Sequence, residues 1–345
     1  MDADHPALVA AARHGLVSRR APVTLTSADF PRVAALARHD HLSGFLAAAV
    51  ADGAVAVDEG DELLLTAQWH EELVACVVVE ALAVRATATL DAASVRWRLT
   101  KGAAIAHLDY PDPAVRTFGD VDLIIHPDDW IAAVDGLMGD GYQREAQTLP
   151  GDFDRRYGKG ATFTTDQGLE LDLHRRLAIG RFGVSSRMEE LFATSDHVIL
   201  AGRALATPTK THRLLHACFH ASLGGFRRLR AFRDVAQLIV VAEADWQATF
   251  AVAEGWRAEA VVVSAITETW RRLQLPPTHP AYLFAVDVHL SRADKRTLTL
   301  FEQERSWSAQ ALTALPRLSV RESSAYLTSL GTHWLQHRRA KSPTL

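Results

Sequence analysis

The sequence has few of the features that would place a protein outside the cell or in a membrane. It contains only 2 cysteines, Cys76 and Cys218, both in apolar surroundings, which favours buried reduced thiols over a disulfide. The most apolar stretch, 73–84, includes Glu80 and is too short to span a bilayer. The N-terminus lacks a basic region followed by a long apolar run, so we expect no signal peptide. These absences predict a cytoplasmic protein with no membrane partner.

An excess of basic charge is also absent. The net charge is −4, so overall electrostatics do not favour nucleic acid as a partner. The chain of 345 residues is 48% hydrophobic and 23% charged, which is ordinary for a soluble protein of two or three domains. Arginine greatly outnumbers lysine, and the only lysines are Lys101, Lys159, Lys210, Lys295 and Lys341.

The pattern of apolar residues divides the chain into helical and mixed parts. Residues 1–93 are predicted to be helical, with long helices at 31–51 and 62–92. Residues 94–206 alternate between strand and helix patterns, and 207–337 are helical again, with a disordered tail at 338–345. We therefore expect an α+β fold, in which a small mixed-sheet core is flanked by two helical regions. The strands of this core are predicted at 95–100, 120–125, 161–165 and 169–174.

The most informative motif is Asp120-Val-Asp122 at the start of a buried strand. Side chains alternate along a strand, so both carboxylates point to the same side. The later segment 169–174 alternates leucines with Glu170, Asp172 and His174. If the two strands lie side by side, Asp120, Asp122 and Asp172 form a three-carboxylate magnesium site. The alternative is that Asp-x-Asp only ends a strand near solvent and binds no metal.

Two basic residues lie close to the acids in sequence. Lys101-Gly102 follows a predicted strand and opens a helix, where free backbone N–H groups and the lysine charge would cradle a phosphate. The alternative is a plain turn with an exposed lysine. Arg116 lies four residues before Asp120, and could reach a triphosphate, pair with Asp120 or form a surface salt bridge.

The order and spacing of these motifs resemble the uncharacterised bacterial nucleotidyltransferase family, within the DNA polymerase β-like nucleotidyltransferase superfamily. The resemblance covers about 60–275. The matching motifs are Lys101-Gly102, Tyr110-Pro-x-Pro-x-x-Arg116, Gly119-Asp-Val-Asp-Leu123, Glu170-x-Asp-x-His174 and the helical segment around 216–234 with its Arg-Asp-Val-Ala-Gln-Leu ending.

The resemblance implies transfer of a nucleoside monophosphate from an NTP, most directly ATP, with Mg²⁺ or Mn²⁺. It assigns catalysis and metal binding to Asp120, Asp122 and Asp172. The nucleotide-binding positions that it implies are Lys101, Gly102, Arg116, Gly119 and His174. One departure is the first motif, which is usually Gly-Ser or Gly-Gly in the superfamily and is Lys101-Gly102 here. The acceptor is left open between a small molecule, a peptide or protein, and an RNA end.

Two further patterns allow other interpretations. His212, His216 and His220 line one helix stripe, which favours packing on the catalytic core but also has zinc-binding spacing. The run 226–233 is rich in arginine, and we expect a solvated basic face there, with an acceptor contact as the alternative. Two alternatives to a nucleotidyltransferase are a non-catalytic scaffold protein of the same fold and a zinc-dependent hydrolase that uses the three histidines.

Overall fold

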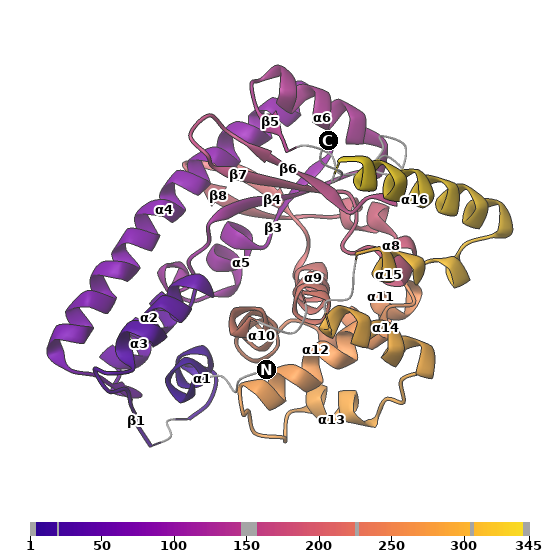
Figure 1. The fold of residues 1–345 in the computed structure, drawn as a ribbon. Helices are drawn as coiled ribbons and strands as arrows, with labels where there is room; N and C mark the ends of the chain where they lie inside the picture. Colours follow the sequence, from indigo (N-terminus) through magenta and orange to yellow (C-terminus); the bar gives the residue numbers. More distant parts are fainter. Residues whose placement is uncertain (1–4, 19–20, 146–156, 225–227, 304–306, 341–345) are drawn as a thin grey trace.

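The computed structural model describes residues 5–18, 21–145, 157–224, 228–303 and 307–340. Helices surround one mixed five-stranded sheet, as Figure 1 shows, and the predicted α+β class is confirmed. The strands follow the order β3-β4-β7-β6-β5 across the sheet, and only β4 and β7 run parallel. Their bounds are β3 Trp97–Thr100, β4 Asp120–Ile125, β5 Gln143–Arg144, β6 Gly160–Thr164 and β7 Glu170–His174.

Short elements complete the sheet region. The helix α5 (Gly102–Asp109) follows β3, as predicted, and α6 (Trp130–Gly139) follows β4. After β7 come α8 (Gly180–Val184) and a separate hairpin of β8 (Asp196–Leu200) and β9 (Arg203–Thr207).

The N-terminal region is helical, as expected, but it is more divided than its sequence suggests. The segment predicted as one helix at 31–51 forms two, because His41 adopts a φ of 53°, outside the helical region. The two-residue strands β1 (Val23–Thr24) and β2 (Val55–Ala56) pair in parallel between the helices. The helices are α1 Pro6–Arg13, α2 Phe30–His39, α3 Ser43–Ala51 and α4 Glu59–Ala92.

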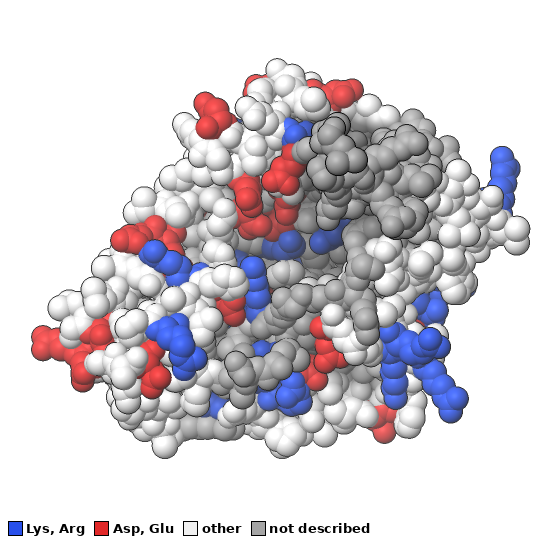
Figure 2. All heavy atoms as spheres, in the orientation of Figure 1, with Lys and Arg blue, Asp and Glu red and all other residues white. Residues whose placement is uncertain are grey.

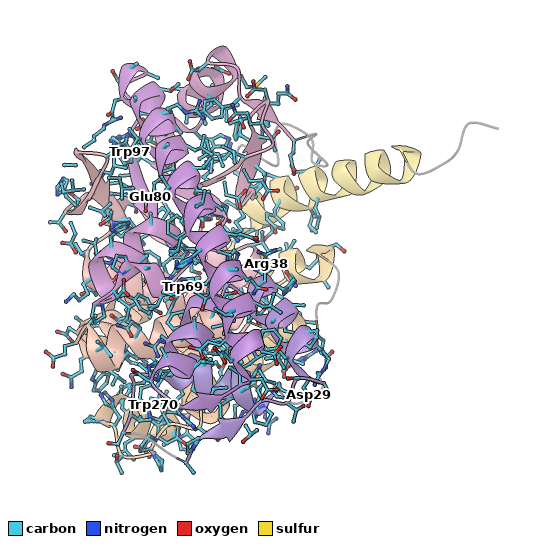
Figure 3. The ribbon with its side chains drawn as sticks, turned by 90° about the vertical axis from the view of Figure 1, so that its left-hand side faces the viewer. Asp29, Arg38, Trp69, Glu80, Trp97 and Trp270 are labelled. Carbon is cyan, nitrogen blue, oxygen red and sulfur yellow. The ribbon has the colours of Figure 1, made fainter. Side chains whose placement is uncertain are left out.

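The long helix α4 runs along one whole side of the molecule (Figures 1 and 3). Its second half packs against the sheet through Val79, Leu82, Ala86 and Leu90, and buried Cys76 there is a free thiol, as predicted. By length and composition this helix of 34 residues could cross a membrane, but core helices of soluble proteins share these properties. One side of α4 is packed against the sheet, whereas its apolar residues Val74, Val77 and Val78 are exposed.

The C-terminal region is a further set of helices, of which α9 to α14 lie below the sheet in Figure 1 and α16 lies beside it. One turn of π-helix, Gln237–Val241, continues α10. The last helix extends to Ala340, so 338–340 are helical rather than part of a disordered tail, and 341–345 lie outside the described residues. The helices are α9 Lys210–Leu223, α10 Leu229–Ala236, α11 Trp246–Gly255, α12 Glu259–Arg272, α13 Pro280–Asp287, α14 Arg292–Glu302, α15 Trp307–Leu312 and α16 Val320–Ala340.

The apolar interior falls into two main clusters. One lies between the sheet, α6 and the second half of α4. The other joins α1, α2 and α3 to α9, α10, α11, α12 and α13. The first three helices of the chain therefore share a core with helices that lie more than 150 residues later in the sequence.

Candidate active site

Four strands align one polar side chain each in a row across the sheet. Asp122 of β4 lies opposite Thr100 of β3 on one side and Asp172 of β7 on the other. Thr162 of β6 lies opposite Asp172. Residues in register on neighbouring strands point to the same face, and Asp120, two positions before Asp122, shares it. The sheet therefore presents all three predicted acids on one face.

Asp122 is the most buried of the three acids, with 2% of its side chain exposed. Its Oδ1 accepts hydrogen bonds from Lys101 Nζ at 2.5 Å and from His174 Nε2 at 2.6 Å. Burial alone would raise the pKa of this carboxyl, but Lys101 and His174 outweigh burial and hold the pKa well below its usual range. Asp122 is therefore ionised at neutral pH.

The other two acids are half-buried. Burial, and then the neighbouring charge of Asp122, raise the pKa of Asp120. Asp172 accepts a hydrogen bond from Thr162 Oγ1 at 2.6 Å, which fixes its carboxylate. A divalent cation would relieve the repulsion between such closely spaced carboxylates.

The geometry of this group fits a cation. One ligand atom each from Asp122, Asp172 and His174 lies within 4.8 Å of the other two. Carboxylate oxygens are the ligands that Mg²⁺ and Mn²⁺ prefer, and His174 is also placed to orient Asp122 through their hydrogen bond. Asp120 lies on the same face and adds a third carboxylate to the donor set.

Lys101, which pairs with Asp122, has an unusual backbone conformation. Its φ of 46° and ψ of −130° are values that side-chain-bearing residues rarely adopt, and such strain costs about 1–3 kcal/mol. Gly102 begins α5, whose first N–H groups lack partners within the helix. Gly119 precedes Asp120 and lies beside His41, whose Cε1 would be 3.4 Å from a Cβ placed on the glycine. Nucleotide contacts of Lys101, Gly102, Gly119 and His174 stay predictions.

A cavity of about 270 Å³ opens next to Lys101. Its polar lining includes Lys101, Lys159, His216 and His220, and its apolar lining includes Phe219. Burial, and then the charge of Lys101, lower the pKa of Lys159 to about 8. Figure 2 shows a hollow on this face of the molecule, with basic side chains inside it and acidic side chains along its upper edge. The cavity is suited to an anionic group.

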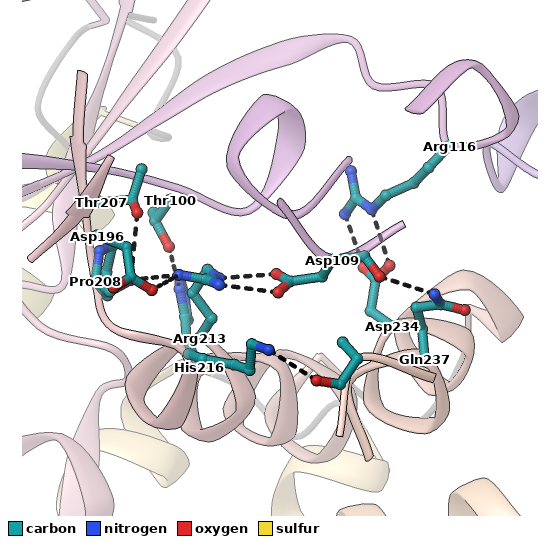
Figure 4. Close-up of polar contacts among 12 residues, drawn as sticks. Thr100, Asp109, Arg116, Asp196, Thr207, Pro208, Arg213, His216, Asp234 and Gln237 are labelled. Atoms are coloured by element: carbon teal, nitrogen blue, oxygen red, sulfur yellow. Dashed lines mark hydrogen bonds and ion pairs between the residues drawn. The ribbon is translucent and has the colours of Figure 1, made fainter. Parts of the chain in front are cut away.

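The structure does not bring Arg116 to the acids. Its Nε and Nη2 donate to the two carboxylate oxygens of Asp234 in α10, at 2.8 and 2.7 Å (Figure 4). Its Nη1 donates to the Gly102 carbonyl at 2.9 Å. Only 1% of Arg116 is exposed. Arg116 therefore pairs with Asp234 rather than with Asp120. A contact of Arg116 with a triphosphate stays a prediction.

Further buried polar contacts attach α9 to the sheet region (Figure 4). Arg213 donates to both carboxylate oxygens of Asp109, at 2.8 and 2.9 Å, and to Asp196 at 2.6 Å. Thr100, in the polar row of the sheet, shares a hydrogen bond of 2.6 Å with His216 Nδ1. These contacts fix the position of α9 beside the acids.

The histidine stripe of α9 packs against its neighbours and forms no zinc site in the described part of the chain. His212 stacks on Trp256 with ring centroids 6.5 Å apart, whereas His216 and His220 face the cavity near Lys101. Among the described residues, only Asp122, Asp172 and His174 bring three metal-ligating atoms together. The predicted packing role of the stripe agrees with these contacts.

In its described part the basic run 226–233 is only partly solvated, because Arg228 alone of its arginines is exposed there. Arg230 and Arg233 are buried, with 8% and 5% exposed. Arg233 donates to the carbonyls of Ala12 and His14, so it joins α10 to the N-terminal helix. Residues 226 and 227 lie outside the described residues.

Sequence reasoning missed three residues around the acids. Thr162 could have been found from the hairpin, since the turn at 166–168 pairs it with Asp172. Thr100 precedes Lys101 and could have been found from the register of β3 and β4. No sequence signal indicates His41, which lies in the bend between α2 and α3.

Comparison with known proteins gives one informative match. Residues 26–271 match the model of a family described as uncharacterised nucleotidyltransferase. No curated protein shows a significant match to the sequence.

Similar solved structures show only low likeness. The antibiotic-resistance factor ANT(2'')-Ia is 12% identical, with a TM-score of 0.35, and the match covers 54% of this chain and 94% of that one. An antigenic nucleotidyltransferase-like protein from Paracoccidioides brasiliensis is 16% identical, with a TM-score of 0.31, over 58% of this chain and 92% of that one. At these TM-scores neither likeness adds to the family match.

Proposed function

The chain belongs to the family of uncharacterised nucleotidyltransferases, and from this membership we propose that it transfers a nucleoside monophosphate from an NTP, most directly ATP, to an acceptor with the help of Mg²⁺ or Mn²⁺. The acceptor offers a hydroxyl or a phosphate and is a small molecule, a peptide or protein, or an RNA end. The net charge of −4 does not favour a large nucleic acid. We place this activity in the cytoplasm.

The single observation that supports this function best is the row of acids on one face of the sheet. Asp122 and Asp172 lie opposite each other on parallel strands, and Asp120 shares their face. These acids would hold the cation, which when bound neutralises phosphate charge and lowers the pKa of a coordinated hydroxyl. A scaffold protein would have no need to keep three carboxylates together beside a strained lysine.

The residues around the acids have separable roles in this proposal. Thr162 holds Asp172 through their hydrogen bond, and Asp172 would help to activate the acceptor hydroxyl. Lys101 pairs with Asp122 in this structure and can turn to a phosphate oxygen, because its four-carbon chain is flexible. His174 keeps the Asp122 carboxylate oriented in either state.

The proposal is tested with Asp122→Asn, which keeps the shape of the side chain and removes its charge. We expect one NTP to raise the melting temperature of the wild type only when Mg²⁺ is present, and the variant to lose that shift. Transfer of labelled nucleotide should fall by at least about 10²-fold, by analogy with the loss of one preorganised charged group in other enzymes.

The matched control is Asp112→Asn, a side chain in an exposed loop that caps its own short helix. Its activity should equal that of the wild type. Full activity in Asp122→Asn would show that the metal site is wrongly assigned. A wild type that neither binds nor transfers any nucleotide would favour the scaffold alternative.

A further inference from the structure

Arg230, in the first turn of α10, is buried without a partner. Only 8% of the residue is exposed, and its Nε makes no hydrogen bond. Within the described residues the whole guanidinium has neither a hydrogen bond nor an ion pair. A buried charge normally keeps close partners, because removing it from water is costly. Arg233, one turn along the same helix, has three acceptors.

The nearby carboxylates cannot serve as that partner. Asp234 follows Arg230 by four residues and so lies on the same helix face. Both of its oxygens are already bound by Arg116, and Oδ1 also accepts from Tyr110. Asp120 is near enough for Arg230 to lower the pKa of its carboxyl, but the two form no ion pair.

The surroundings of Arg230 are otherwise basic or neutral. Burial, and then the charge of Arg230, lower the pKa of His41 to about 3, so this imidazole is uncharged at neutral pH. Burial, Lys101 and Arg230 together hold the pKa of His220 well below its usual range. The charges of Lys101 and Arg230 both act on His220, which lines the cavity together with Lys101 and Lys159.

We propose that Arg230 binds a phosphate oxyanion of the substrate next to Asp120. The inference rests on the proposed function, since Asp120 cannot serve both a metal ion and Arg230. With a cation held by the acids, Asp120 is neutralised, and Asp234 is already bound by Arg116, so Arg230 needs an anion from outside the chain. A guanidinium donates two parallel hydrogen bonds to a phosphate, which suits this position. The phosphate belongs either to the triphosphate of the donor or to the acceptor.

The first test measures binding of pyrophosphate and of inorganic phosphate by calorimetry, with Mg²⁺, to the wild type and to Arg230→Gln. We expect the variant to bind at least one of these anions at least about tenfold more weakly, the loss typical of a charge-assisted hydrogen bond. The matched control is Arg32→Gln, which removes an exposed arginine with 63% of its side chain accessible. Equal affinities in Arg230→Gln and in the control would overturn the proposal.

A second measurement separates binding from a structural role. Arg230 has no partner in the ligand-free protein, so Arg230→Gln should melt at or above the temperature of the wild type without ligand. A lower melting temperature would show that the guanidinium supports the fold and would also overturn the proposal.

A comparison of ATP with AMP shows whether the phosphate that Arg230 binds belongs to the donor or to the acceptor. If Arg230 binds the donor, the variant binds ATP and pyrophosphate more weakly while AMP affinity is unchanged. If it binds the acceptor, ATP affinity is kept and inorganic phosphate affinity falls. These binding measurements need no turnover, so they stand apart from the proposed function: a wild type without transferase activity would refute that function but not the anion site.

Discussion

At the scale of single residues, the site depends on ion pairs between segments far apart in the sequence. One carboxylate oxygen of Asp122 accepts hydrogen bonds from both Lys101 and His174. Arg116 and Asp234 form a second, fully buried pair, which joins the segment before β4 to α10. Burial alone would raise the pKa of Asp234, but Arg116 outweighs burial and lowers the pKa. Removing one member of such a pair leaves the other charge buried and unpaired.

We therefore expect Asp234→Ala to lower the free energy of unfolding by about 3–5 kcal/mol, as measured by urea denaturation. Arg116 would keep only the Gly102 carbonyl, and Tyr110 would lose its acceptor. The control is Glu268→Ala, whose pair with Arg271 is exposed and should be worth less than about 1 kcal/mol. A loss below about 1 kcal/mol in Asp234→Ala would mean that Arg116 finds another partner.

The sequence predicts the acids better than it predicts their surroundings. Asp120, Asp122 and Asp172 follow from a local pattern, because strand alternation sets the direction of each side chain. The partner of Arg116 does not follow from any local pattern, because Asp234 lies 118 residues away. The nearer Asp120 is the natural choice from sequence alone, and only the packing of α10 rules it out.

At the scale of elements, α9 combines helix packing with the chemistry of the site. Its buried face carries His216, bonded to Thr100, and Arg213, bonded to Asp109. Burial, and then the charge of Lys101, hold the pKa of His216 well below 6.5. In the unfolded chain the imidazole regains a pKa near 6.5. Below that pH, unfolding takes up a proton that the folded state excludes.

Stability should therefore fall as pH drops from about 6.5 towards 5, by up to about 1.4 kcal/mol per pH unit for each such histidine. His216→Asn can keep the bond to Thr100, because its amide nitrogen occupies the place of Nδ1, and it has no proton to gain. We expect a shallower dependence of unfolding free energy on pH in this variant, measured by denaturation at pH 7.5, 6.5, 5.5 and 5. An unchanged slope would show that His216 is protonated in the folded protein.

Element positions were predicted well where a pattern is local. The strands at 120–125 and 169–174 and the helix after Gly102 were found within a residue or two. The break between α2 and α3 was missed, because His41 is not a residue that commonly ends a helix. Its positive φ belongs to a local cap of α2, in which the Leu42 N–H donates to the Ala37 carbonyl at 2.7 Å.

At the scale of the whole molecule, the two apolar clusters cut across the order of the chain. The sequence suggests separate helical regions at 1–93 and 207–337, and that division stays a prediction. In the structure, α1, α2 and α3 bury Leu8, Val33 and Phe45 in the same cluster as Phe232 and Val261. No local sequence pattern reveals that these two regions share a core, because the apolar residues of each helix would look the same if they packed within their own region.

We expect a chain that starts at residue 58 to lose its stable helical core. Deleting α1, α2 and α3 would uncover Phe232 and remove the Ala12 and His14 carbonyls that Arg233 needs. Circular dichroism should show a lower and broader melt than that of the full chain, and the fragment should bind a dye for exposed apolar surface. A sharp melt at the temperature of the full chain would instead show that the first three helices are dispensable.

The shared core also affects how the protein is made. The Ala12 carbonyl can accept its hydrogen bond only after Arg233 has been synthesised, 221 residues later in the chain. At about 5–20 residues per second, the first helices spend roughly 10 to 40 seconds without the surface that covers them. The growing chain, rather than the finished one, is then the form most open to aggregation during synthesis.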